Sequence, residues 1–169
     1  MDTDARHAAD GTPPTVSLPA IRRAAAWAAC AWATAFSLIH LYWLLGGRAG
    51  LPAGHSLYAN TPLLVIDIVA IPLCAAAAAF ALALVRPWGT RLPRRLHTTA
   101  LWATTALLIL HAAPSVPDWV ALAAGTRTTA DLDAMVRFAA LFYEPFFMTG
   151  GLLFALASLR TPGRRRPRR

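Results

Sequence analysis

Four long apolar runs constrain the fold of this chain more than any other feature. They cover about residues 24–45, 62–85, 98–116 and 134–159. An α-helix rises about 1.5 Å per residue, so roughly 20 apolar residues are needed to cross the hydrocarbon core of a bilayer. Three runs reach this length, and the third is slightly short. Because the connecting loops are also short, the sequence predicts an all-α fold, a four-helix transmembrane bundle of up-down-up-down topology.

The arginines are distributed unevenly around these runs. The chain has no lysine and a formal net charge of +8. Only Arg48 and Arg127 lie in the two loops of one side, and Arg137 lies near the start of the fourth run. The positive-inside rule therefore predicts that both termini are cytoplasmic. Thirteen arginines belong to the cytoplasmic side: Arg6, Arg22, Arg23, Arg86, Arg91, Arg94, Arg95, Arg160, Arg164, Arg165, Arg166, Arg168 and Arg169.

These charges also bear on partners. Arginines just beyond a membrane helix are best explained by contact with anionic lipid headgroups, so we expect membrane lipids as partners and no nucleic acid. Residues 1–20 are polar and are predicted to form a disordered cytoplasmic tail, because they lack the basic and then apolar order of a secretory signal. Residues 21–159 form the membrane domain, and residues 160–169 form a basic cytoplasmic tail. Cys30 and Cys74 lie inside spans and are interpreted as small packing residues.

The second outer loop carries two local signals. Residues 117–124 are predicted to form a short helix on the membrane surface, with Trp119 at the interface. Thr128 or Thr129, followed by Asp131 and Asp133, is typical of a helix N-terminus and predicts where the fourth span begins.

Each apolar run contains one ionisable side chain. These are His40, Asp67, His111 and Glu144. Burying such groups in hydrocarbon costs several kcal/mol unless they are paired or hydrated, so they are functional candidates. All four fall in the outer leaflet, at depths of roughly 10 Å or less by the rise of a helix. If they point inward, the two histidines face each other across a pocket, as do the two carboxylates, because alternate helices of such a bundle are diagonal.

Aromatic and basic side chains accompany this level. Pro145 and Pro72 lack a backbone N–H, and they are expected to free the carbonyls of Leu141 and Ile68. Arg137 lies two turns above Glu144 and is expected to pair with a carboxylate, Asp67 included, or to hold an anionic head group. The rings near His40 and Glu144 fit an interfacial belt and also a cavity that stabilises positive charge. Predicted substrate-binding residues are Arg137, Trp43, Tyr42, Phe36, Tyr143 and Phe147.

Two sequence blocks carry a resemblance to a known family. They are H-L-Y-W-L-L-G-G at 40–47 and F-Y-E-P-F-F-M-T-G-G-L-L-F at 142–154. They resemble the motifs of small four-span membrane proteins of high-GC bacteria that are catalogued as a domain of unknown function, and this resemblance implies a place in the bacterial cytoplasmic membrane. The resemblance covers about residues 24–159, and it implies the architecture and the importance of these blocks without implying a chemistry. The matching residues are His40, Tyr42, Trp43, Gly46, Gly47, Glu144, Pro145, Gly150 and Gly151.

The favoured functional interpretation is a membrane-embedded enzyme acting on a hydrophobic isoprenoid or lipid substrate. Glu144 is expected to stay protonated among aromatic rings and act as general acid, and Asp67 to act as base or orienting partner. His40 and His111 are expected to relay protons, and the rings to shield a cationic intermediate. A protonation-initiated terpene cyclase or isomerase fits these parts. The likeness to membrane-embedded terpene cyclases is one of kind only, with no shared motif.

Two other interpretations remain open. No cofactor is predicted for the enzyme, but His40 and His111 are also suited to ligate haem, or to join Asp67 and Glu144 in a site for a divalent metal. Against this, no Glu-x-x-His pair of the di-iron type is present. The third interpretation is a proton-coupled carrier, or an accessory subunit that packs against another membrane protein through Gly150 and Gly151. The carrier would have to form a homo-oligomer.

Overall fold

The computed structural model describes residues 17–51 and 57–159. The predicted tail at 1–16 and the basic tail at 160–169 lie outside the described residues. Within the described ranges the regular structure is helical, without strands. The longer helices are α1 (Leu18–Leu44), α2 (Thr61–Ala83), α3 (Arg94–Ala112), α4 (Val116–Ala123), α5 (Ala134–Phe138) and α6 (Glu144–Ser158), and 3₁₀ turns lie at Leu57–Ala59, Pro87–Arg91, Ala113–Ser115 and Thr129–Asp131.

Four stretches of helix in the described residues are long and apolar enough to cross a membrane. They span Leu18–Leu44, Thr61–Ala83, Arg94–Ala123 and Ala134–Ser158. The predicted all-α class with four membrane-spanning helices is therefore confirmed, and the chain is an integral membrane protein. The first helix already begins at Leu18, inside the stretch assigned to the N-terminal tail, because Pro19 fits the first turn of a helix.

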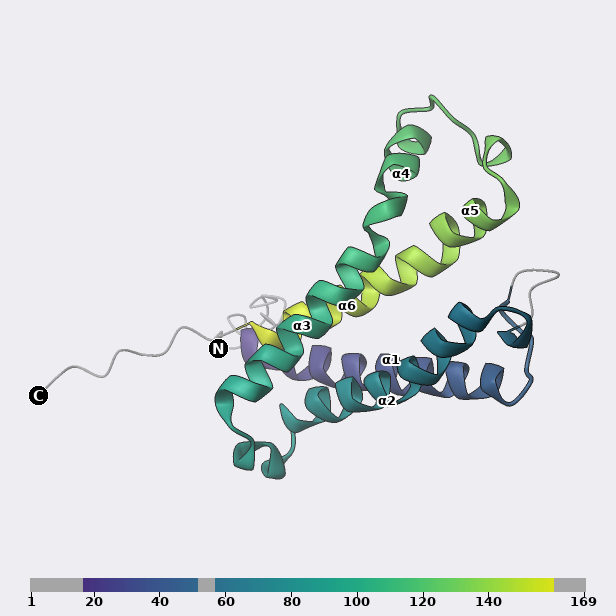
Figure 1. Ribbon diagram of the computed structural model, residues 1–169. Helices are drawn as coiled ribbons and strands as arrows, with labels where there is room; N and C mark the ends of the chain where they lie inside the picture. Colours follow the sequence, from purple (N-terminus) through teal and green to yellow (C-terminus); the bar gives the residue numbers. More distant parts are fainter. Residues whose placement is uncertain (1–16, 52–56, 160–169) are drawn as a thin grey trace, which may run out of the picture.

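The third span is longer than the apolar run that predicted it. α3 starts at Arg94, directly after Pro93, and passes through one 3₁₀ turn at Ala113–Ser115 into α4. Pro114 and Pro117 lack the N–H groups that a continuous α-helix needs, so the helix tightens and bends there. The predicted short helix near 117–124 is thus present as Val116–Ala123, but it continues beyond α3 rather than crossing the bundle end (Figure 1).

Side chains define where the spans begin. Asn60 caps α2 by accepting the N–H of Leu63 at 3.1 Å. Asp133 caps α5 by accepting from Met135 and Val136, each at 2.9 Å. These bonds satisfy backbone donors that have no partner inside the helix. The fourth span thus begins at Ala134 behind Asp133, whereas Thr128, one of the two threonines expected there, caps the separate 3₁₀ turn Thr129–Asp131.

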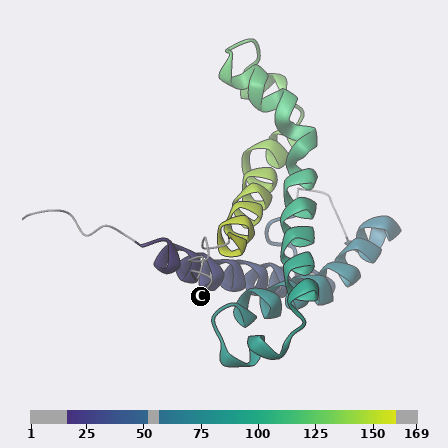
Figure 2. The same cartoon turned by 90° about the vertical axis from the view of Figure 1, so that its left-hand side faces the viewer.

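Small residues allow the helices to approach closely. α1 contributes Ala29 and Ala33 to the core, where they meet the alanine-rich face of α2 and the fully buried Phe154 of α6. α1 pairs with α2, and α3 pairs with α6. Figures 1 and 2 show that these two pairs diverge from the end where α1 begins toward the end where it finishes. Room for a site is therefore left at the outer end.

Gly150 and Gly151 face two different neighbours within the chain. A Cβ on Gly150 would lie 2.6 Å from the ring of Trp32, and one on Gly151 would lie 2.7 Å from Cγ1 of Ile109. Real Cβ atoms do not come so close to other atoms, so these positions hold glycine because α6 packs tightly on both α1 and α3. In this structure the glycine pair serves packing inside the chain, and not a surface for another protein.

Candidate functional site

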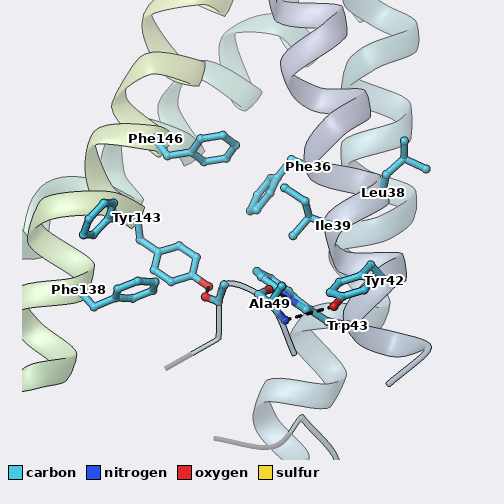
Figure 3. A pocket seen from close by; sticks show the side chains of 11 residues that line it. Phe36, Leu38, Ile39, Tyr42, Trp43, Ala49, Phe138, Tyr143 and Phe146 are labelled. Atoms are coloured by element: carbon cyan, nitrogen blue, oxygen red, sulfur yellow. Dashed lines mark hydrogen bonds between the residues drawn. The ribbon is translucent and has the colours of Figure 1, made fainter. Parts of the chain in front are cut away.

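A cavity of about 650 Å³ lies at the outer end of the bundle between α1 and the start of the fourth span. One wall comes from α1 and the other from the segment 138–146, and their rings face each other across the space (Figure 3). Leu38 and Phe142 remain largely exposed on membrane-spanning helices, so we infer that the cavity opens toward lipid. Its lining is Phe36, Leu38, Ile39, Tyr42, Trp43, Ala49, Gly50, Phe138, Phe142, Tyr143 and Phe146.

The first motif block builds the outer rim of this cavity. Gly46 turns the chain with a positive φ of 94°, and Gly47 lies so close to Tyr42 that a Cβ would be 2.2 Å from its ring. The hydroxyl of Tyr42 then accepts the N–H groups of Arg48 and Ala49, both at 3.3 Å. These contacts fold the loop back over the aromatic end of α1. The two glycines are thus required by the backbone and by the ring that covers it.

Further side chains hold the same loop from both walls. Trp43 donates its indole N–H to the carbonyl of Ala49 at 2.8 Å. From the opposite wall, the hydroxyl of Tyr143 donates to the carbonyl of Gly50 at 3.1 Å. The loop therefore joins the two diverging helix pairs where they are furthest apart.

His40 and Asp67 form a close pair between α1 and α2. Nδ1 of His40 lies 2.6 Å from Oδ1 of Asp67, and both side chains are buried. The contact places one proton between the two groups, and it is carried by Nδ1 when the carboxylate only accepts. With inward-pointing side chains, the two histidines were expected to face each other. Instead, His40 turns to the neighbouring helix and finds the carboxylate there.

The His40 ring lies directly behind the cavity wall. Its centroid is 4.5 Å from that of Phe36 and 5.2 Å from that of Trp43. Both of these aromatic residues line the cavity, whereas His40 and Asp67 do not. Oδ2 of Asp67 is buried and accepts no hydrogen bond from the described residues. The contact with Asp67 thus orients the His40 ring and leaves the second carboxylate oxygen without a donor. One layer of side chains, Phe36 and Trp43, separates the pair from the cavity.

Glu144 follows a π-helical segment, Ala139–Tyr143. The N–H of Glu144 bonds to the carbonyl of Ala139, five residues earlier, so the register is one residue longer than in an α-helix. In this register Pro145 would bond to Ala140, but proline has no N–H. The carbonyl left open is therefore that of Ala140, and not that of Leu141 as the sequence suggested from an α-helical register.

Trp119 fills the gap that Pro145 leaves. Its indole N–H donates to the carbonyl of Ala140 at 2.7 Å. α4 thereby supports the π-helical segment, although the two are 21 residues apart in sequence. From the sequence, Trp119 was expected only at the membrane interface. Its partner is visible only once the π register is known.

Glu144 is buried beside the residues that line the cavity, but does not line it itself. Its Oε2 accepts no hydrogen bond within the described part of the chain. His111 of α3 is close enough to Glu144 to act on it electrostatically, and its ring centroid lies 3.9 Å from that of Phe147. Phe147 in turn meets Phe36, with centroids 5.3 Å apart. Aromatic contacts therefore connect the surroundings of the two histidines.

The structure divides the predicted site residues into two layers. Phe36, Tyr42, Trp43 and Tyr143, four of the predicted substrate-binding residues, line the cavity. Behind the wall lie His40, Asp67, Glu144 and Phe147, whereas His111 does not line the cavity and is exposed on α3.

Arg137 does not contact either carboxylate. It is exposed and donates to the carbonyl of Thr129 at 3.4 Å. In the described residues it forms no ion pair with Asp67 or Glu144. The expected pairing is therefore not observed, because α5 carries Arg137 toward the loop before Thr129 rather than into the cavity.

Several lining residues were not identified from the sequence. Ile39 lies three residues after Phe36 and four before Trp43, so helical spacing places all three on one face and could have indicated it. Ala49 and Gly50 gave no signal, because their place depends on the fold of the loop. The described residues contain no group of three or more His, Cys, Asp or Glu side chains positioned to hold a metal ion.

Fold and site together define a class: a four-helix integral membrane protein with an apolar, aromatic cavity at one end and a buried His40–Asp67 pair and Glu144 behind its wall. The chain belongs to the family described as "Protein of unknown function (DUF3995)", whose model matches residues 33–154. The matched range contains both motif blocks and every residue of the cavity lining. No curated protein and no solved structure matches the chain.

Proposed function

We propose that this protein binds a hydrophobic small molecule of the isoprenoid or lipid type in the outer cavity and acts on it by acid–base chemistry. The observation that carries the proposal is the cavity itself. Its size of about 650 Å³ falls within the range of small-molecule sites, and its walls are almost wholly apolar. An opening toward lipid would let such a ligand enter from the bilayer.

The rings suit the binding of an extended hydrocarbon. Phe36 and Phe146 lie edge to face, with centroids 5.1 Å apart, and Trp32 stacks on Phe146 at 4.7 Å behind them. Packed rings of this kind give a wall that keeps its shape and stabilises positive charge across the ring face. Few polar groups reach the space, so the site favours shape and hydrophobicity over a polar head group.

The acid–base part of the proposal rests on the second layer. Isomerisation of a double bond requires that an acid adds a proton to one carbon and a base removes a proton from a neighbouring carbon, so the sum of atoms is unchanged. Glu144, proposed as the neutral acid, lies behind the lining, so the wall rings would have to move aside before it could supply the first proton. The pair of His40 and Asp67 would accept the second, because Asp67 holds the Nδ1 proton and leaves Nε2 of His40 as the base. Cyclisation adds one step between these two, in which the electron pair of a second double bond attacks the cation, forms the ring bond and moves the positive charge to another carbon.

The first experiment tests binding. Purified full-length protein in lipid nanodiscs is irradiated with a photoreactive diazirine isoprenoid, and the labelled residues are identified by mass spectrometry. Labelling is expected on both cavity walls and is expected to fall about tenfold in Ile39→Trp, which fills the space. The matched control is Ile66→Trp on the exposed face of α2, which should label like the parent. Uniform labelling of all lipid-facing residues, unaffected by Ile39→Trp, would contradict a specific site.

The second experiment tests the chemistry apart from binding. The protein is incubated with mixed prenyl lipids in deuterated water, and incorporation of deuterium at carbon is followed by mass spectrometry. Incorporation should disappear in Glu144→Gln while the photolabelling persists. If neither Glu144→Gln nor the parent protein incorporates deuterium, the binding proposal stands without the enzymatic one.

Haem and metal chemistry remain as an alternative that the same sample addresses. Nδ1 of His40 is engaged by Asp67, so only Nε2 is left for a ligand role. An absorption spectrum with a Soret band, or stoichiometric metal in the purified protein, would favour that alternative.

A further inference from the structure

A second cavity, of about 320 Å³, lies at the opposite end of the bundle from the aromatic one. α1 begins there, and α2 and α6 end there; Figure 1 shows the start of α1 and the end of α6 together. The character of this cavity is the reverse of the outer one, because its surface is mainly polar. Its lining is Pro19, Arg22, Arg23, Ala26, Leu84, Val85 and Ala157.

Two arginines give this cavity its charge. Arg22 is partly buried and Arg23 is exposed, and each guanidinium group carries one positive charge. The carbonyl ends of α2 and α6 oppose them with about half a negative charge each at most. The two full positive charges outweigh this, and Arg86 adds another at the same end, where its guanidinium lies 5.1 Å from the ring centre of Trp27.

The guanidinium group also fits one class of anion by shape. Its planar set of donors matches the oxygens of a phosphate in pairs, and such bonds are stronger than those between neutral groups. A cavity with arginines at consecutive positions can therefore hold a phosphate group from two directions.

The level of the cavity favours a lipid over a soluble phosphate. Three helix ends mark the boundary between the apolar spans and water, which is the level of lipid headgroups. On the same helix ends, Ile21, Trp27 and Leu156 expose apolar surface. An acyl chain would cover this surface when the phosphate sits between the arginines, whereas inorganic phosphate would leave it uncovered.

We propose that the cavity between the start of α1 and the ends of α2 and α6 binds the phosphate of an anionic phospholipid. The proposal is independent of the outer cavity and its ligand. It assigns Arg22 and Arg23 to a built site, distinct from the general attraction of the basic inner loop for anionic membranes.

Native mass spectrometry of the full-length protein tests this site. The protein in neutral detergent is titrated with phosphatidylglycerol, with phosphatidylcholine, or with inorganic phosphate alone. We expect phosphatidylglycerol to bind most tightly, and the double variant Arg22→Gln, Arg23→Gln to weaken that binding at least about tenfold. The matched control is Arg94→Gln, Arg95→Gln, which removes the same charge on the same side without touching the cavity.

The outcomes separate the explanations. An equal loss in both double variants would show that only net charge matters, and would overturn the site. Tight binding of inorganic phosphate alone, lost in the Arg22 and Arg23 variant, would overturn the lipid assignment. If the double variant does not fold by circular dichroism, Arg23→Gln alone decides. That side chain is exposed, and its replacement must still weaken phosphatidylglycerol binding several-fold more than Arg94→Gln does.

Discussion

The indole N–H of Trp119 donates to the carbonyl of Ala140, 2.7 Å away, at the one backbone position that Pro145 leaves without a donor. A π-helical turn and a proline would otherwise combine to leave an unpaired carbonyl inside an apolar span, where its cost is largest. The side chain that prevents this comes from α4. The bend that extends the third span beyond α3 thus supports the segment that places Glu144.

Trp119→Phe is predicted to destabilise the protein by about 1 kcal/mol, the usual net value of one hydrogen bond. The ring remains, so most of the packing is kept. Unfolding by sodium dodecyl sulfate in mixed micelles, followed by circular dichroism, measures the change. Trp102→Phe is the control, because Trp102 is an exposed residue on α3.

Pro145→Ala provides a sharper form of this test. It restores a backbone N–H that can bond to Ala140, so Trp119→Phe should cost much less in the Pro145→Ala background than in the parent. Equal costs in both backgrounds would show that the indole bond does not compensate for the proline.

The pair of His40 and Asp67 is predicted to stabilise α1 against α2 only as a pair. Asp67→Leu alone leaves a buried histidine without its acceptor and should cost about 3–5 kcal/mol. His40→Leu together with Asp67→Leu should recover much of this loss, because an apolar pair needs no partner. The same micelle titration measures the coupling between the two sites.

This prediction has a clear counter-result. If Asp67→Leu is as stable as the parent, the 2.6 Å contact does not determine the stability of the buried pair. Ile66→Leu serves as the control, since Ile66 is next to Asp67 on α2 but exposed.

Gly150→Ala is predicted to destabilise the bundle by about 1–3 kcal/mol through overpacking against Trp32. The new methyl group would lie 2.6 Å from the indole, which cannot move far because it stacks on Phe146. Trp32→Leu should suppress the effect by making room, whereas Ile109→Ala, which faces Gly151, should not. Full additivity of Gly150→Ala and Trp32→Leu would count against this packing.

The sequence pattern was sufficient to locate the four spans, but not to predict which side chains would meet between them. Apolar length identified four helices, and the caps at Asn60 and Asp133 follow from local chemistry that acts within three residues. The partner of His40 depends on the rotation of α1 about its own axis. Hydropathy does not define that rotation, since all faces of the span are apolar.

The candidate site shows the same division. Rings at Phe36, Tyr42 and Trp43 could be assigned to a cavity because they gather at one end of one span. The π register before Pro145 could not be predicted, because it depends on a tertiary contact from Trp119. Arg137 was expected to reach a carboxylate on the basis of spacing alone, and the path of the loop before α5 places it elsewhere.

Thr128 and Asp131 form a capping box at the start of the 3₁₀ turn Thr129–Asp131, outside the membrane spans. The stability of this cap is predicted to depend on pH. The backbone N–H of Thr128, and then its hydroxyl, hold the pKa of Asp131 below its ordinary value. A lowered pKa means that the cap is fully formed above the unfolded pKa, near 3.9, and is lost as the pH falls through the folded value. Thr128→Val removes the hydroxyl bond and should raise the pKa of Asp131 part of the way back.

Carbon-13 chemical shifts of the Asp131 carboxyl, followed from about pH 6 down to pH 2, measure this pKa. Thr126→Val is the matched control, because its hydroxyl donates to the carbonyl of Ala121 and not to a carboxylate. A lowered pKa that survives unchanged in Thr128→Val would assign the whole effect to the backbone N–H.

The bond between Tyr143 and Gly50 is predicted to hold the outer loop over the aromatic cavity. Tyr143→Phe keeps the ring in the wall but removes the donor to the carbonyl, 3.1 Å away. The loop should open more often, so a bound isoprenoid probe should dissociate about 3 to 10 times faster, which corresponds to one net hydrogen bond. Amide hydrogen exchange at Arg48 and Ala49 should rise by a similar factor even without a probe.

Tyr58→Phe is the control, because its hydroxyl donates to the carbonyl of Leu44 at the same end of the bundle but its ring does not line the cavity. Faster exchange with an unchanged dissociation rate would mean that the loop moves without controlling access, and that the ligand leaves through the opening toward lipid.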